Sequence, residues 1–314
     1  MSSPMKGSIA TKIDKKIERM TIPEKDKIDV VCRTLQNVSK DIPNYMILRE
    51  SLQNEIDSVV MRDDNKDVEI CVDPFHNNDG SIMVSGEGIG FTENVVFENF
   101  NSMFNSYKFQ QLELQRDFDQ CKGIGIKSAA YGRVDLGYKT RNSDNALQFN
   151  FTSDAYGYPG LEKYVNVDDD GDEYEESILY IGDSDFSYLN TNQTGTELLM
   201  TSVDDGNLSE NLAKSIHSLF GSFGKKLKEN YGWSYIRFFN MRYWSFPKNI
   251  RVKVMEGPKG TGVTVHGAEH YLINKSLNSG VQKYSIETES GNVNFNLRWF
   301  IMEEEMNNHF AIYT

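Results

Sequence analysis

Carboxylate and amide side chains follow one another at helical spacing in RESLQNEIDS, residues 49–58. Glu50 and Asn54 are four residues apart, so on a helix they share one face, and Asp57 lies three residues further on. The Asn54 carbonyl oxygen suits Mg²⁺, which prefers oxygen ligands and keeps several waters. A carboxylate one turn away can deprotonate a water aimed at a phosphate. The same spacing also occurs on many solvated helices, which is the plainer interpretation of this segment alone.

Glycines dominate the segment SGEGIGF at residues 85–91. Gly86, Gly88 and Gly90 come directly after a predicted strand. There they permit a tight turn and a close approach of the backbone to a ligand, because glycine has no Cβ. An ordinary glycine-rich turn is the alternative interpretation of this segment when it is taken alone.

A second glycine segment, CKGIGIKS at residues 121–128, predicts a loop that runs into a helix. Gly123 and Gly125 open it, and Lys127 lies just inside the helix. Backbone N–H groups at a helix start, together with a lysine, attract phosphates. Further on, QTGTELLM predicts a turn that leads into a strand and offers the hydroxyl of Thr196. A solvated lysine and an ordinary strand start are the plainer alternatives.

Hydrophobic periodicity predicts the elements that position these segments. Helices are expected at residues 25–40, Tyr45–Val60 and Leu208–Asn230. Strands are expected at Val68–Val72, Ser81–Ser85, Leu136–Thr140, Leu147–Thr152, Ile178–Ile181 and Gly195–Thr201. Short strands are expected after Trp233, with turns at GPKGTG and LNSG. Helices followed by antiparallel strands predict an α+β sandwich, with helices on one face of a mostly antiparallel sheet.

The chain divides in this interpretation into three parts. Residues 1–24 form a polar arm, residues 25–205 a first domain, and residues 206–314 a second α+β domain, which is incomplete if the sequence is a fragment. The acidic run DDDGDEYEE at residues 168–176 is expected in an exposed loop between strands.

Composition excludes several classes of protein. The net charge of −13 disfavours nonspecific nucleic-acid binding by the whole surface, and no apolar run approaches the length that spans a membrane. The odd and widely spaced cysteines Cys32, Cys71 and Cys121 favour a reducing, intracellular compartment over a disulfide framework. His266 and His270 have helical metal-ligand spacing, but Gly267 between them favours a turn over a metal site.

The order of the four segments resembles the GHKL ATPase superfamily of gyrase, heat-shock chaperones, histidine kinases and MutL. There, an E-x-x-x-N-x-x-D helix precedes a strand ending in G-x-G, a phosphate loop G-x-G-x-K-S and a late strand that starts with G-T. The resemblance covers roughly residues 28–205. FNSMFNSYK at 100–108, followed by CKGIGIKSAAYG, also resembles the phage RIIA-like and MORC-like branch.

The resemblance implies a Bergerat-type sandwich that binds ATP and Mg²⁺, followed by a transducer-like domain. Glu50 would be the catalytic carboxylate and Asn54 the Mg²⁺ ligand, and residues 92–120 would form a lid. It implies slow hydrolysis, closure of the lid, a homodimer or a protein partner, and the cytoplasm, that of the host if the protein is from a phage. The other nucleotide-binding residues would be Asp57, Glu87, Gly88, Gly90, Lys108, Gly123, Gly125, Lys127 and Thr196.

One departure concerns the base. The family's first glycine motif normally begins with an aspartate that accepts a hydrogen bond from the adenine amino group, and Gly86 stands there in this sequence. The first glycine of the phosphate loop is also replaced, near Gln120 and Cys121. Losing a charge-assisted hydrogen bond costs about 1.5–3 kcal/mol. Glu87 is the neighbouring acid that can substitute, if its side chain points into the pocket.

Two alternatives therefore stay open beside the ATPase. A degenerate GHKL fold without nucleotide would act as a protein-interaction module, for instance in a conflict between phage and host. The stretch from Lys225 to Lys253 mixes basic and aromatic residues, a composition that can bind single-stranded nucleic acid. Its aromatic residues are more simply the core of the second domain.

Overall fold

The computed structural model describes residues 42–62, 66–74, 79–100, 125–153, 159–167, 170–204, 206–220, 232–255, 261–288 and 291–302, with a few single positions, Arg33, Asn37, Ser39, Asp64, His76 and Asn77; residue 63 is not among them. The predicted arm at residues 1–24 and most of the predicted helix at residues 25–40 lie outside this part of the chain.

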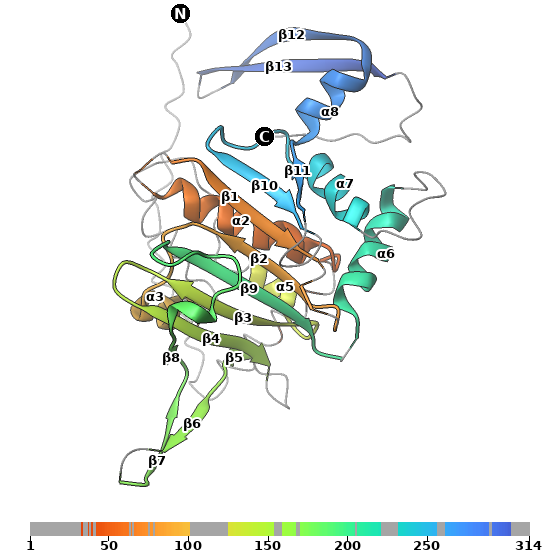
Figure 1. Cartoon of the computed structure of the whole chain (residues 1–314). Coiled ribbons are helices and arrows are strands. Elements are labelled where there is room, and N and C mark those ends of the chain that lie inside the picture. The colour runs from red at the N-terminus through yellow and green to blue at the C-terminus, as the bar shows by residue number, and fades with distance from the viewer. Residues whose placement is uncertain are drawn as a thin grey trace, which may run out of the picture.

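One mixed sheet of nine strands forms the centre of the molecule (Figure 1). Its strands are β1 (Val68–Asp73), β2 (Ile82–Gly86), β3 (Val134–Arg141), β4 (Ala146–Ser153), β5 (Pro159–Leu161), β8 (Leu179–Tyr180), β9 (Gly195–Ser202), β10 (Ile250–Val254) and β11 (Val263–Val265). The order is β11-β10-β1-β2-β9-β3-β4-β5, with β8 beside β4. Among the strands that the structure describes, only β1 and β10 pair in parallel in this sheet. The predicted α+β class with a mostly antiparallel sheet is confirmed.

Helix α2 (Met46–Val60) packs on the middle of this sheet, beside β2. It begins three residues after Pro43, whose carbonyl accepts the N–H of Met46 at 2.9 Å. Its buried stripe reads Leu48, Leu52, Glu55 and Val59, the three- and four-residue spacing of a helix face. The stripe is apolar except for Glu55, so one carboxylate is carried into the contact between helix and sheet.

Five further helices are described: α3 (Glu93–Phe100), α5 (Gly125–Ala130), α6 (Leu208–Phe220), α7 (Gly232–Arg242) and α8 (Ala268–Lys275). The strands predicted after Trp233 are confirmed from β10 onward, but the stretch directly after Trp233 is helix α7 and not a strand. Aromatic residues favour strands on average, but Tyr235, Phe238 and Phe239 recur here at helical spacing and are fully buried. Phe238 packs edge-on against Tyr45, with 5.6 Å between ring centroids.

The sheet continues beyond the predicted domain boundary at residue 205. β10 pairs with β1 in parallel, from Val68 opposite Ile250 to Val72 opposite Val254, and β11 extends the edge. The core of this sheet is therefore built from both sides of that boundary.

Two hairpins extend away from the central sheet (Figure 1). One joins β6 (Tyr164–Val167) to β7 (Glu173–Glu176), so the acidic run predicted as a loop is partly a strand, with Lys163 paired to Glu175 at 2.6 Å. The other joins β12 (Ser276–Thr288) to β13 (Gly291–Met302). The turn predicted at LNSG lies within β12, because paired alternation there outweighs the local turn composition.

No helix in the described ranges is both long and apolar enough to cross a lipid bilayer.

Candidate functional site

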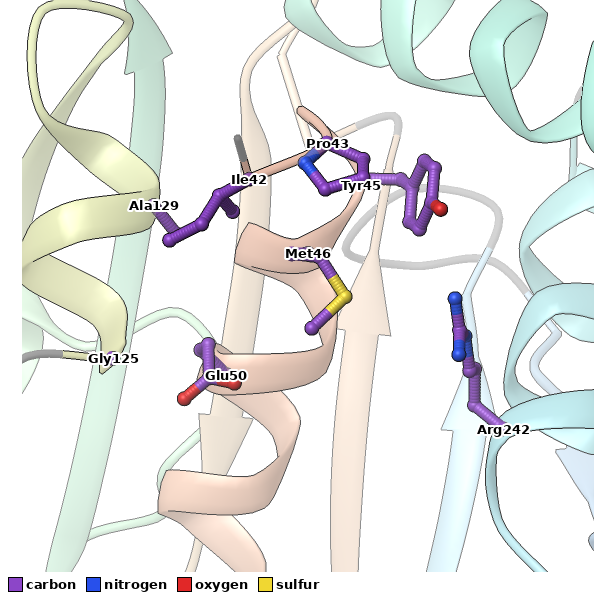
Figure 2. A pocket seen from close by; sticks show the side chains of 8 residues that line it. All are labelled: Ile42, Pro43, Tyr45, Met46, Glu50, Gly125, Ala129 and Arg242. Carbon is purple, nitrogen blue, oxygen red and sulfur yellow. The ribbon is translucent and has the colours of Figure 1, made fainter. Parts of the chain in front are cut away.

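The catalytic carboxylate predicted at Glu50 lies directly beside the start of α5. A Cβ added to Gly125 would collide with the Glu50 carboxylate, so the glycine allows this close approach. Arg49 contributes an ion pair to Glu50, with 3.1 Å between Nη1 and Oε1. Figure 2 shows Glu50 pointing from α2 toward Gly125. Two sequence segments predicted to act together, the helix at 49–58 and the loop before Lys127, thus meet at this point.

Asn54 and Asp57 follow Glu50 along α2 on successive turns, both half-buried. A rise of about 1.5 Å per residue places Asn54 about 6 Å along the axis from Glu50. Gln53 donates a hydrogen bond to Asp57 from Nε2 to Oδ1 at 2.7 Å, which orients that carboxylate. The amide oxygen of Asn54 is thus one turn from Glu50, as the sequence predicts.

The glycine loop after β2 is held between the C-terminal half of α2 and the chain before β9. A Cβ on Gly88 would collide with the Ser58 side chain. The Ser58 hydroxyl accepts the N–H of Ile89 at 3.2 Å, and Thr194 donates to the Gly88 carbonyl at 2.8 Å. The loop backbone is therefore fixed against α2.

Glycine is required at position 90 by the backbone conformation and by a close backbone contact. Its φ is +69°, a left-handed conformation, and a Cβ there would collide with the Arg141 carbonyl. Phe91, the next residue, donates its N–H to the Thr140 hydroxyl at 2.8 Å. Gly90 is therefore needed where the loop between β2 and α3 turns against the end of β3.

The Glu87 side chain lies beside Arg62 and not beside Gly86 at the end of β2. Arg62 Nη1 donates to the Glu87 carbonyl at 2.5 Å and lies 4.0 Å from its Oε2. Arg62 also pairs with Asp64 at 2.5 Å. The acid that sequence reasoning offers as a substitute at the base therefore lies in a separate ion-pair group.

The carboxylate that lies at Gly86 is that of Glu55. An added Cβ on Gly86 would be 2.8 Å from Glu55 Oε2. Glu55 is 5% exposed, and Gly86 pairs across the sheet with Thr196, which is 2% exposed. Burial first, and then the charge of Glu55, raise the pKa of Tyr138 on β3. The acid beside Gly86 is thus Glu55 on α2 and not Glu87.

Lys127 is buried in the first turn of α5, and burial lowers the pKa of its ammonium to about 8. Its Nζ donates to the Asn99 carbonyl in α3 and lies 5.8 Å from the Phe100 ring centroid. The side chain therefore links α5 to α3, the described part of the predicted lid.

A cavity of about 320 Å³ opens at the N-terminal end of α2 (Figure 2). Its volume is at the lower limit for small-molecule sites. The Arg242 guanidinium stands over the Tyr45 ring, 5.6 Å from its centroid. Asn54, Gly88 and Thr196 do not line it, so it covers the Glu50 end of the predicted site and not the base end. Its lining residues are Ile42, Pro43, Tyr45, Met46, Glu50, Gly125, Ala129 and Arg242.

The remaining predicted positions fall elsewhere. Lys108 and Gly123 lie outside the described residues, as do Lys225, Lys226 and Lys228 of the basic stretch. His266 and His270 stack with 4.3 Å between ring centroids, His270 within α8. Over the described ranges, no group of three or more His, Cys, Asp or Glu residues is arranged to hold a metal ion.

Sequence reasoning missed Glu55, Ser58 and Thr194. Glu55 had a readable signal, since it is an acid within the apolar stripe of α2, where a charge needs a reason. Ser58 and Thr194 had none, because their importance arises from hydrogen bonds to a loop distant in sequence.

Comparison with known proteins does not assign a family to the chain. No protein-family model matches the chain, and no curated protein matches it with significance.

Proposed function

We propose that the chain binds Mg-ATP along the half-buried side of α2 that carries Glu50, Asn54 and Asp57, and hydrolyses it slowly, in a Bergerat-type sandwich. The observation that carries the proposal is the contact between Glu50 and Gly125. It joins a potential general base to a loop whose glycines and lysine suit phosphates. The cavity at the same place supplies room for a small ligand.

The roles follow from position. Glu50 would accept the proton of the attacking water, because its carboxylate reaches the cavity. Asn54 would supply an amide oxygen to Mg²⁺, and phosphate oxygens and water would complete the coordination, as Mg²⁺ prefers. Helix α3, linked to α5 through Lys127, would move with the nucleotide as part of the lid.

Calorimetric titration with a non-hydrolysable ATP analogue and Mg²⁺ tests this proposal. We expect saturable binding with one nucleotide per chain at micromolar concentrations. No heat of binding up to millimolar nucleotide would overturn it. Glu50→Gln is the matched variant, because it keeps the volume of the side chain, so it should bind the analogue and lose turnover.

A second candidate function, protein interaction, is favoured by the hairpin of β12 and β13. Alternation along β13 places its apolar side chains on one face. We call this the hairpin face: Tyr284, Ile286, Val293, Phe295, Leu297, Trp299 and Ile301, each 38–52% exposed. The opposite face carries Asn292, Asn294, Asn296 and Arg298, and Arg298 pairs with Glu269 on α8.

The occupant that we propose for the hairpin face is a second copy of the chain. Its three aromatic side chains, at about 150–250 Å² each and half-exposed, together with the four smaller aliphatic ones offer on the order of 600 Å². That is close to the roughly 800 Å² that each partner contributes to a standard interface. Sedimentation velocity should therefore detect a dimer that Phe295→Lys dissociates and Asn294→Lys, on the opposite face, leaves intact. A monomer at all concentrations would end this candidate.

A further inference from the structure

Two imidazole rings lie face to face where α8 begins. The centroids of the His266 and His270 rings are 4.3 Å apart, with 29° between the ring planes. Both side chains are exposed, so solvent and its ions reach them. The pair directly follows β11 at the edge of the sheet (Figure 1), and neither residue belongs to the nucleotide site proposed above. The contact between the two rings therefore needs an explanation of its own.

The backbone brings the two rings together. Gly267 has a φ of +88°, which lets the chain turn between the end of β11 and α8. Asn240 on α7 fixes this turn, because its Oδ1 accepts the N–H of His266 at 3.1 Å and that of Gly267 at 2.9 Å. Ala268 then donates its N–H to the carbonyl of Tyr243 at 2.8 Å, which fixes the start of α8. The turn that the sequence offers as the alternative to a metal site is thus what places the rings in contact.

The chemistry of two stacked imidazoles suits a metal ion. Two imidazolium cations at this spacing would repel each other, so the packing favours at least one neutral ring, which carries a lone pair on one nitrogen. Imidazole nitrogen is a good ligand for Zn²⁺, Ni²⁺ and Cu²⁺. Two nitrogens that share one tetrahedral ion lie about 3.4 Å apart, since metal–nitrogen distances are about 2.0–2.1 Å. Rings with centroids 4.3 Å apart reach that spacing by a small rotation of their side chains.

A third side chain supports one of the two ligands. Asn274 lies one turn further along α8, and its Nδ2 is 2.9 Å from Nε2 of His270. When the amide turns over, its carbonyl oxygen can accept Nε2–H, which leaves the lone pair of Nδ1 for a metal ion. Histidines that bind metals commonly donate their other N–H to such an acceptor. Asn274 is therefore placed to orient the His270 ring toward His266.

We propose that His266 and His270 together bind one divalent cation of the transition-metal class, with Zn²⁺ as its representative, and that water completes the coordination. Mg²⁺ does not fit this site, because it prefers oxygen ligands. The inference does not rest on the proposed nucleotide binding. The bound ion would join α8 to the end of β11, next to the hairpin of β12 and β13, since Glu269 of α8 pairs with Arg298 of β13. The site would thus fix α8 where the hairpin meets the sheet.

Calorimetric titration of the full, untagged chain with Zn²⁺ tests the proposal. We expect one ion per chain, with a Kd on the order of ten to a hundred micromolar, because two protein ligands bind more weakly than the four of a structural zinc site. His266→Gln and His270→Gln should each weaken binding by about tenfold or more, since each removes one of the two ligands. His217→Gln, which alters an exposed histidine on α6, should leave the affinity unchanged.

Hydrogen exchange locates the bound ion. At about ten times the Kd, Zn²⁺ should slow the amide exchange of α8 by about tenfold in the unaltered chain and leave it unchanged in His266→Gln, while Mg²⁺ should have no effect on either. Thermal unfolding without metal should be the same in all variants, because the substituted side chains are exposed. The absence of saturable binding up to millimolar Zn²⁺ would overturn the proposal, and so would binding that survives both substitutions.

Discussion

Two carboxylates are buried on opposite faces of the central sheet, and their surroundings differ. Glu197, on β9, is 1% exposed and accepts backbone N–H groups from Ser187, Tyr188 and Leu189 at 2.5–2.9 Å. Glu55, on the α2 face, is nearly as buried, and its Oε2 lies 2.8 Å from the position that a Cβ on Gly86 would take. Burial is therefore common to both acids, and only the neighbours distinguish them.

The neighbours of Glu197 extend into a polar network that holds a loop on the sheet. Tyr188 donates its hydroxyl to Asp73, which is fully buried, and His76 Nδ1 lies 3.5 Å from the same carboxylate. Burial, and then the hydrogen bond to Asp73, raise the pKa of Tyr188. A buried acid whose carboxylate accepts three backbone N–H groups of one loop, as Glu197 does, holds that loop on the sheet.

The difference predicts that acids on the α2 side affect the ligand and acids on the opposite side affect folding. The largest effect is expected at Glu50. Glu50→Ala should reduce turnover by about a hundredfold or more, because a general base contributes that much, while nucleotide affinity stays within about threefold. Phosphate release and calorimetry measure the two quantities. Unchanged turnover would remove Glu50 from the chemistry.

Glu197→Ala should show the opposite behaviour. It leaves the N–H groups of Ser187, Tyr188 and Leu189 buried without their acceptor, so the free energy of unfolding should fall by about 3 kcal/mol. Urea titration measures this change. Nucleotide affinity of the folded fraction should be unchanged. A large loss of affinity with no loss of stability would contradict the assignment of Glu197 to folding. Glu197→Gln keeps one acceptor oxygen and should lose less.

Gly90→Ala sharpens the comparison within the glycine loop itself. Its φ of +69° and the collision with the Arg141 carbonyl predict a loss of about 2 kcal/mol in the free energy of unfolding. Gly171→Ala is the matched control, since Gly171 also has a positive φ, +89°, but no atom lies within 4 Å of the added Cβ. An equal loss at both positions would mean that the positive φ, and not the close approach of the Arg141 carbonyl, requires glycine at position 90.

The smallest effect concerns pH. Lys127 has a pKa of about 8 in the folded chain, against 10.5 normally, so it loses its charge as the pH rises through 8. If it contacts phosphate, affinity should fall by roughly tenfold between pH 7 and pH 9. Stability should change in the other direction: the unfolded chain keeps this proton up to about pH 10.5, so the Lys127 contribution rises between pH 8 and 10.5.

Calorimetry at the two pH values, with Lys127→Met as the variant without a titrating group, measures the change in affinity. A level affinity in the unaltered chain would place Lys127 in the structural link to Asn99 alone.

Much of the central architecture could be predicted from the sequence. Helix α2 and strands β1, β2, β3, β4 and β9 follow the periodicity of their apolar residues, which is strong where one face is buried. The approach of Glu50 to Gly125 followed from motif order and not from any local pattern. Helix α7 was missed, since its aromatic residues suit strands locally and only their packing selects the helix: Phe238 contacts Tyr45, and α7 lies against α6, β10 and β11.

The position of Glu55 relative to Gly86 was beyond sequence reasoning for a different reason. Its stripe position on α2 indicates burial, but which strand residue it meets depends on how helix and sheet are aligned. Glu87 was the acid nearest in sequence, and alternation along the extended chain carries it away from Gly86 toward Arg62. The acid adjacent to Gly86 in sequence therefore did not predict the acid beside it in the fold, whereas the buried face of α2 did.

The parallel pairing of β1 with β10 also sets an order of events during synthesis. β1 leaves the ribosome early, but the partner for one of its edges is complete only at Val254. At about 5–20 residues per second, that interval is on the order of ten seconds or more. Until then Val68, Ile70 and Val72 belong to an unprotected strand edge, which is a template for aggregation. The nascent chain is therefore expected to need chaperone protection until α7 and β10 have emerged.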